Sequence, residues 1–376
     1  MTSTALHPAE IARSVSRLHL TVGVEEEFLL LDPRTWQNAP RADAAREQLP
    51  AAMRERSQVE FRRSMMEMVS PVCTDLPQLH DALRENRAAA GAAAESVGAR
   101  LVAVGATPIG EPDLEVVDTP RYHAIARHYG PIAHDPALCG FHVHVGVPDR
   151  ELAIQVCTAI RPWLPVVQAL TANSPWHAGT DSGHASWRGI ALERWPSLGP
   201  SPYLRSSAEY ERVVAELVAT GVMLDATMVL WWARPSSRYP TVEVRVADVC
   251  PTAAETVVMA GLVRALVATA IADIAAGREA LQPPEHLLRA AHWNAAHSGM
   301  SGTLIDLRTH EARPAWDLVE DLIELVHDAL DRHGDRVRVV LGLGRLREHG
   351  TGAERQRRNG TVADAMLSVS RATVTN

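Results

Sequence analysis

The sequence predicts an α+β fold in which helices cover the convex, apolar face of a curved antiparallel β-sheet. Three segments, at 20–31, 139–147 and 241–249, alternate apolar residues with ionisable ones, as strands with one buried face do. Two long apolar segments, 252–276 and 314–333, have helical length and are the natural cover for the apolar face. We therefore expect the ionisable residues of the three strands on the concave face.

The other elements are predicted in chain order from local signals. Helices are expected at 75–97, 121–129, 149–170, 206–220 and 284–297, and further strands at 58–70, 100–106 and 228–233. Asp75 or Asp81 is a candidate N-cap of the first helix, and Pro162 and Pro165 predict a kink in the third.

Three stretches lack a clear period. Residues 1–18 are expected to form a short helical lead-in or a loose terminus. Residues 173–203 hold many Asn, Ser, Gly, Pro and Trp residues, and so long an irregular segment is usually functional. The tail 348–376, rich in Arg, Gly and Thr, is expected to be poorly ordered, with a short helix near its end. With no clear linker or repeat, we expect one catalytic domain over 1–376.

The composition excludes several classes of protein. The 376 residues are 46% hydrophobic and 22% charged, which is typical of a globular chain. The net charge of −8, from 37 basic and 45 acidic residues, argues against a nucleic-acid partner. We find no run of about 18 apolar residues and no signal peptide, so no membrane association and a cytoplasmic location are expected. Four separated cysteines argue against a Cys-based zinc site.

The chain contains no lysine, so all 37 basic residues are arginine. A Walker A motif, a kinase-type strand lysine and a Schiff-base lysine are thereby excluded. Any phosphate must be bound by arginine, histidine, backbone N–H groups or metal ions.

The three alternating strands carry the candidate chemistry. Their ionisable residues are Glu25 and Glu27, His142 and His144, and Glu243 and Arg245. Taken singly, a charged strand face is most often the solvent side, and a His-x-His pair is more often a core or surface feature than a ligand pair. Carboxylates clustered on adjacent strands would repel one another unless cations lay among them. Magnesium prefers such oxygen ligands and arginine suits phosphate, so we predict a Mg-nucleotide site.

Glu60 and Glu67 are further candidates for the same site. Seven residues separate them, which places them on opposite faces of a straight strand. Both can reach the site only if a bulge or break lies between them. The alternative for each is a surface or ion-pair role.

Five blocks of this sequence resemble the type 2 glutamate–cysteine ligase family. They are TVGVEEEFLLLD (21–32), EFRRSMMEMVSP (60–71), CGFHVHVGVPD (139–149), ANSPWHAGTDSGHASWR (172–188) and TVEVRVADVCPT (241–252). The resemblance implies a glutamine synthetase-like catalytic domain that uses ATP and Mg²⁺ or Mn²⁺. It also implies amide-bond formation through an acyl phosphate, in the type reaction from glutamate and cysteine, and assembly as a homo-oligomer.

The resemblance also implies roles for individual residues. Catalysis would rest on Arg245, Glu27 and His142, with His142, His144 and Arg245 at the nucleotide. Glu25, Glu27, Glu60, Glu67 and Glu243 would hold metal, and Arg188, Asn173, Ser186 and His184 would lie at the amino-acid and amine substrates.

The block at 172–188 departs from the family pattern at His177, His184 and Trp187, and Phe141 stands where a small polar residue is common. These departures leave the acceptor open, so a different amino acid or amine is an alternative to cysteine. A metal-dependent hydrolase and a non-catalytic nucleotide-binding or partner-binding protein are the remaining alternatives.

Overall fold

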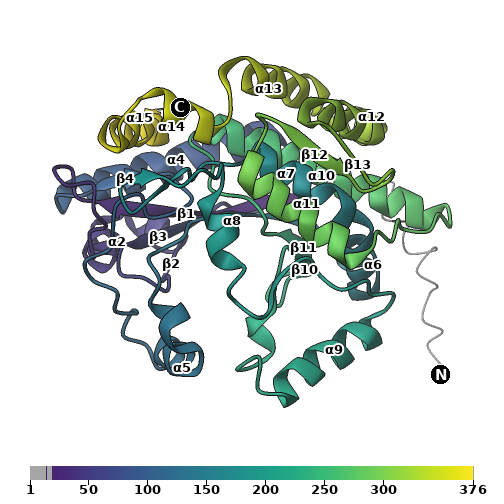
Figure 1. Ribbon diagram of the computed structural model, residues 1–376, viewed down its shortest axis with the longest axis horizontal. Helices are drawn as coiled ribbons and strands as arrows, with labels where there is room; N and C mark the ends of the chain where they lie inside the picture. The colour runs from purple at the N-terminus through teal and green to yellow at the C-terminus, as the bar shows by residue number, and fades with distance from the viewer. Residues whose placement is uncertain (1–13, 15–18, 376) are drawn as a thin grey trace.

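The computed structural model describes Ser14 and residues 19–375, so the expectation for 1–18 falls almost wholly outside the described residues. A seven-stranded sheet crosses its centre, and every strand pair within it is antiparallel (Figure 1). In spatial order the strands are β10 (Ala233–Pro235), β11 (Thr241–Val244), β5 (Phe141–Gly146), β1 (Val22–Leu31), β3 (Met65–Val69) and β2 (Ser57–Gln58), while β4 (Arg100–Val102) pairs with the end of β1. The predicted antiparallel sheet is therefore confirmed.

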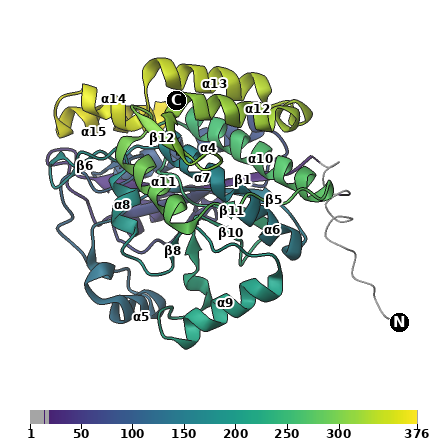
Figure 2. The ribbon, with the colours of Figure 1, turned by 45° about the vertical axis from the view of Figure 1, so that its right-hand side comes forward.

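Helices cover the apolar face of this sheet in two layers. α4 (Leu76–Ser96), α6 (Arg150–Ile160) and α10 (Ala253–Ala275) pack on the strands. α12 (Ala315–His333) and α13 (Arg336–His349) pack on α10 instead, on the side away from the sheet (Figures 1 and 2). The prediction that 314–333 covers the sheet directly is wrong. Because α10 is apolar around its circumference, with 16 of 23 residues buried, it needs helices on its outer side as well.

No segment apolar enough to span a membrane was expected, but α10 is such a segment. Its length and mean hydropathy of 2.0 meet that criterion. However, 78% of its most apolar window is buried inside the protein, as expected for the core helix of a globular fold.

Local sequence signals explain several helix ends. Asp75 caps α4, since its carboxylate accepts a hydrogen bond from the Gln78 N–H at 2.9 Å. The predicted break at Pro162 is present: α6 gives way to a 3₁₀ turn, η2 (Arg161–Trp163), and then to α7 (Leu164–Leu170).

Two helices lie across the sheet from α12 and α13, on the side of its polar face: α5 (Pro120–Tyr129) and α9 (Ser207–Ala219) (Figures 1 and 2). The irregular segment 173–203 contains only short elements, namely β6 (Trp176–His177), β7 (Thr180–Asp181), α8 (Trp187–Leu192) and β8 (Leu198–Gly199). The other elements are α2 (Ala42–Gln48), α3 (Ala51–Arg54), η1 (Gly130–His134), η3 (Ala226–Met228), β9 (Leu230–Trp231), α11 (Glu285–Ser298), β12 (Thr303–Asp306) and β13 (Glu311–Pro314).

Helices form in residues 348–375, the described part of the C-terminal tail, so its expected poor order is wrong, while the short helix expected near its end is confirmed. The tail forms α14 (Gly352–Arg358), which begins with a capping box between Thr351 and Glu354, and α15 (Val362–Thr375). Thr373 is buried and its hydroxyl accepts a hydrogen bond from the Ala103 N–H at 3.0 Å. The polar composition of the tail belongs to the exposed faces of two short helices that pack on the domain.

Candidate active site

The strand register gathers carboxylates and imidazoles at the middle of the sheet. Glu25 lies opposite His142, and Glu243 lies opposite His144. On the other side of β1, Glu27 lies opposite Glu67. The alternation predicted from the sequence therefore places the side chains of β1, β5 and β11 on one face of three adjacent strands, and Glu67 joins them from a fourth, β3.

Glu25 lies between both histidines. Its carboxylate is 3.0 Å from Nδ1 of His142 and 3.4 Å from Nε2 of His144. Burial alone would raise the pKa of Glu25, but the adjacent imidazoles of His142 and His144 hold it well below its usual value. Nδ1 of His142 is approached both by Glu25, at 3.0 Å, and by the guanidinium of Arg245, at 3.2 Å. Its Nε2 lies 3.7 Å from Glu27.

Glu27, Glu60 and Glu67 form a second group, in which like charges lie together. Burial is the largest cause that raises the pKa of Glu67 well above its ordinary value, and the neighbouring Glu60 adds to it. Burial and Glu60 also raise the pKa of Glu27. Glu60 reaches this group because the chain leaves the sheet between β2 and β3, at residues 59–64. The break that the sequence argument required is present.

The group around Glu25 has the geometry of a divalent-cation site. Ligand atoms of Glu25, His144 and Glu243 all lie within 4.8 Å of one another. Nε2 of His144 is buried and makes no hydrogen bond, while its Nδ1 is 2.9 Å from the Thr241 hydroxyl. A fixed imidazole with a free nitrogen between two carboxylates is a ligand set for a metal ion. The repulsion among Glu27, Glu60 and Glu67 would be relieved in the same way.

Two arginines flank Glu243. Arg234 donates from Nε to its carboxylate at 3.0 Å, and Arg245 donates to the same carboxylate. Burial would raise the pKa of Glu243, but the two guanidinium groups hold it below the ordinary value. Arg234 was not predicted from the sequence, because its position opposite Glu243 follows from the β10–β11 register, which only the folded chain shows.

Arg188 reaches the site from α8. Its side chain is buried and donates to the backbone carbonyls of Val246, at 3.2 Å, and Arg245, at 3.3 Å. The guanidinium passes over Gly140, where a Cβ atom would lie 2.8 Å from Cζ of Arg188. Arg188 can therefore lie beside Glu27 and Glu60 only because residue 140 is a glycine.

Asn173 and Ser186 do not face a substrate cavity, which corrects their expected role. The Asn173 amide donates to the carbonyls of Ala103, at 2.8 Å, and Val249, at 2.7 Å, inside the protein. Ser186 caps α8 and donates to Asp248 at 2.8 Å. Both residues are buried, and they hold the segment that carries Arg188. In an irregular segment, buried polar side chains form the hydrogen bonds that backbone N–H and C=O groups would otherwise lack. The sequence alone does not distinguish such residues from residues that bind a substrate.

His184 lies outside both cavities described below, so its expected substrate contact is corrected too. Its ring is edge-on to Trp187, at a centroid distance of 5.6 Å, and to His297, at 5.1 Å. His177 stacks on Trp187 at 4.5 Å. His177 and His184, two of the three residues that depart from the family pattern, therefore pack against the third, Trp187.

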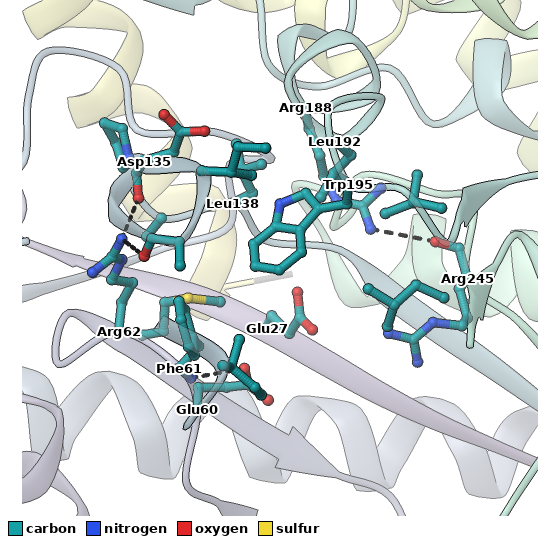
Figure 3. Close-up of a pocket in the computed structure, with 18 of the residues that line it drawn as sticks. Glu27, Glu60, Phe61, Arg62, Asp135, Leu138, Arg188, Leu192, Trp195 and Arg245 are labelled. Carbon is teal, nitrogen blue, oxygen red and sulfur yellow. Dashed lines mark hydrogen bonds between the residues drawn. The ribbon is translucent and has the colours of Figure 1, made fainter. Parts of the chain in front are cut away.

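Two cavities open on the carboxylate face. The first, the Glu27 cavity, has a volume of about 250 Å³ and is lined by Glu27, Glu60, His142, Arg188 and Arg245 on its charged side. Trp195 and Leu138 lie across it from Glu27 (Figure 3). The second, the Glu25 cavity, has a volume of about 570 Å³, and its lining includes Glu25, His144, Val72, Tyr239 and Thr241. Glu25 and Glu27, alternate residues of β1, thus line two separate cavities.

Comparison with known proteins decides the family. The model of glutamate–cysteine ligase family 2 matches residues 21–369. Relatives from Salinispora arenicola and Salinispora tropica, each named "Putative glutamate--cysteine ligase 2", are 60% identical over 339 residues, which is 90% of this chain and of each relative. The chain belongs to glutamate–cysteine ligase family 2. The resemblance seen in the sequence blocks is confirmed.

Solved structures show that this family 2 member shares its fold with ligases. Glutamate–cysteine ligase from Francisella tularensis, solved in complex with AMP, gives a TM-score of 0.66 at 12% identity and covers 96% of this chain and 90% of that one. A bifunctional glutathione synthetase from Pasteurella multocida gives 0.70 at 13% identity, over 97% of this chain and 53% of that one. These likenesses confirm the predicted fold class.

The family 2 site also contains residues for which the sequence argument gave no signal. Asp248 accepts hydrogen bonds from the Asn173 N–H at 2.9 Å and from the hydroxyls of Ser174 and Ser186 at 2.7 and 2.8 Å. It also lies 3.8 Å from Arg188. Asp248 therefore positions Arg188 from behind, where periodicity could not reveal it.

Proposed function

We propose that this family 2 member is an ATP-dependent carboxylate–amine ligase that forms ADP and phosphate through an acyl-phosphate intermediate. The observation that carries the proposal is the row of carboxylates and imidazoles between two cavities. A carboxylate oxygen of the first substrate attacks the γ-phosphorus of ATP, and ADP leaves. The amine nitrogen of the second substrate then attacks the acyl carbon, phosphate leaves, and the nitrogen loses a proton.

The cavities suit the two kinds of ligand. The Glu25 cavity has more than twice the volume of the Glu27 cavity, so it is assigned to the nucleotide, the larger ligand. Arg188 and Arg245 line the Glu27 cavity, which is therefore assigned to the substrate carboxylate and the amine. The γ-phosphate would lie between the two, beside the carboxylate row.

The acidic residues support a requirement for Mg²⁺ or Mn²⁺. Glu25, His144 and Glu243 would hold one ion, and Glu27, Glu60 and Glu67 would hold another. When bound, these ions neutralise negative charge on the nucleotide phosphates. His142, hydrogen-bonded to Glu25, would keep its Nε2 toward the transferred group.

Two arginines provide charge that does not depend on metal. Arg245 would neutralise the transferring phosphoryl group, since its side chain faces the Glu27 cavity beside Glu243. Arg188 would bind the carboxylate of the donor substrate, because its guanidinium is fixed by backbone carbonyls and by Asp248. Glutamate is the donor that the family name suggests.

The test is release of ADP from ATP with Mg²⁺, glutamate and an amine, together with the mass of the amide product. We expect ADP release to require both the carboxylate and the amine, and Glu27→Gln to abolish it. Glu115→Gln, at an exposed residue away from both cavities, is the matched control. Phosphate release in the absence of ATP would instead favour a hydrolase. Homo-oligomeric assembly is a separate prediction, to be checked by light scattering.

A further inference from the structure

The wall of the Glu27 cavity that lies opposite Glu27 is lined by apolar and aromatic side chains. It is built from separate segments of the chain, and its members are Phe61, Tyr122, Ile125, Leu138, Leu192, Trp195, Met228, Leu230 and Trp232. A surface of this kind binds apolar groups by removing them from water.

Aromatic contacts hold this wall in place. Phe61 meets Tyr122 edge-on at a centroid distance of 5.3 Å and Trp195 at 6.4 Å. Trp195 also packs on Tyr129 at 5.1 Å. The Tyr122 hydroxyl donates to the Val59 carbonyl at 2.7 Å, so it is already engaged by the protein itself. The wall is thus a preformed aromatic surface.

Within the described part of the chain, every arginine that lines the cavity is already engaged or has a role in the proposed reaction. Among the described residues that line it, the arginines are Arg62, Arg188 and Arg245. Arg62 is buried and donates to the backbone carbonyls of Leu114, Ala133 and Asp135. In the proposed ligase reaction, Arg188 binds the donor carboxylate and Arg245 the phosphoryl group. A carboxylate on an acceptor that packs against the apolar wall would therefore find no lining arginine left to pair with it, which is costly where that carboxylate is buried.

We propose that the acceptor of this ligase is a primary amine with an aromatic or branched apolar group and no carboxylate. The inference rests on the proposed ligase reaction and names its second substrate. The apolar group lies against Trp195 and Phe61, and the amine nitrogen points toward Glu27 and the acyl phosphate. Nitrogen forms the bond to the acyl carbon, the bond from that carbon to the phosphate oxygen breaks, and a proton leaves the nitrogen.

Four amines separate size from charge in one experiment. L-Cysteine is small and carries a carboxylate, and cysteamine is the same molecule without the carboxylate. L-Phenylalanine and 2-phenylethylamine form the corresponding large pair. With ATP, Mg²⁺ and glutamate held constant, we expect kcat/KM for 2-phenylethylamine to exceed that of each other amine by about tenfold or more.

The outcomes distinguish this inference from the proposed function. Amide formation fastest with cysteine, or equal with all four amines, would overturn the acceptor assignment and leave the ligase reaction intact. No ADP release with any of the four would overturn both.

A variant then tests the wall itself. Trp195→Ala should raise KM for 2-phenylethylamine by about tenfold, while KM for ATP and for cysteamine changes less than about twofold. Trp293→Ala is the control, because that side chain is 46% exposed on α11 and does not line the cavity. An unchanged KM in a folded Trp195→Ala protein would remove the wall from acceptor binding.

Discussion

Glu27 and Glu67 face each other across the β1–β3 pair, so two carboxyl groups share one buried position of the sheet. Like charges at such a position repel unless a proton or a cation lies between them. The protein thus carries a local destabilisation that a ligand can relieve.

Divalent metal should therefore stabilise the protein. Because Mg²⁺ binds the folded carboxylate group and not the unfolded chain, a hundredfold excess over Kd should add about 3 kcal/mol, and ATP should add more. Calorimetry on metal-free and metal-loaded protein measures this. Glu67→Gln should show a smaller rise in Tm with metal and an equal or higher Tm without it, while Glu115→Gln keeps the wild-type response. A metal-free Tm that drops sharply in Glu67→Gln would indicate a structural carboxylate with a buried partner.

The same pair should make metal-free stability depend on pH. Burial and Glu60 raise the pKa of Glu67 well above its ordinary value of about 4.5, so the folded state binds this proton more tightly than the unfolded state. Stability should therefore fall as pH rises from about 4.5 through the raised pKa. Denaturant melts across this window measure the slope. We expect a shallower slope in Glu67→Gln, and a variant slope equal to that of wild type would contradict the assignment.

Arg245 should act on the rate rather than on nucleotide binding. Arg245→Lys keeps the charge but loses the planar fork, so kcat should fall by ~10²–10⁴-fold with KM for ATP changed far less. Steady-state kinetics at saturating metal measure both. Tm should move little, because Arg234 still pairs with Glu243. Arg212→Lys, at an exposed helical pair, is the control. A kcat within about threefold of wild type would leave Arg245 as an ordinary ion-pair partner.

Gly140 should be required for the placement of Arg188. An added Cβ would lie 2.8 Å from Cζ of Arg188 and 2.9 Å from the Ala247 carbonyl oxygen, so the guanidinium must move. We expect Gly140→Ala to raise KM for the carboxylate donor by about tenfold, with KM for ATP nearly unchanged. Gly344→Ala is the matched control, since a Cβ there meets nothing within 4 Å. Equal donor KM values in the two variants would show that Arg188 does not bind the donor.

The reverse face of β1 is held by a buried ion pair. Glu26 accepts two hydrogen bonds from Arg87, at 2.6 and 3.0 Å, and one from Thr256 at 2.7 Å. Removing one partner leaves a buried charge, so Arg87→Ala should lose about 3–5 kcal/mol in denaturant unfolding. Arg212→Ala, from an exposed pair with Glu216 at 2.7 Å, should lose less than about 1 kcal/mol. Similar losses in the two variants would contradict this account.

The strand faces could be predicted because they depend on local geometry. Side chains alternate with a period of two, so Glu25 and Glu27 had to share a face opposite Val24, whatever the neighbouring strands were. The Asp75 cap and the break at Pro162 also depend only on nearby residues. The sequence by itself therefore determined the chemistry of the polar face, and its blocks also indicated the family.

Only the tertiary structure decided which polar residues of the irregular segments face a cavity. Asn173, Ser186 and Arg188 are all polar residues of one irregular segment, and the sequence does not say which of them faces a cavity. In the structure the first two form hydrogen bonds inside the protein, whereas Arg188 passes over Gly140 and lines the Glu27 cavity. The same holds for Arg234 and for the aromatic wall around Trp195, whose members come from distant segments. The physical reason is that side-chain direction in a loop has no period, and it is set by long-range hydrogen bonds and packing that exist only once the chain has folded.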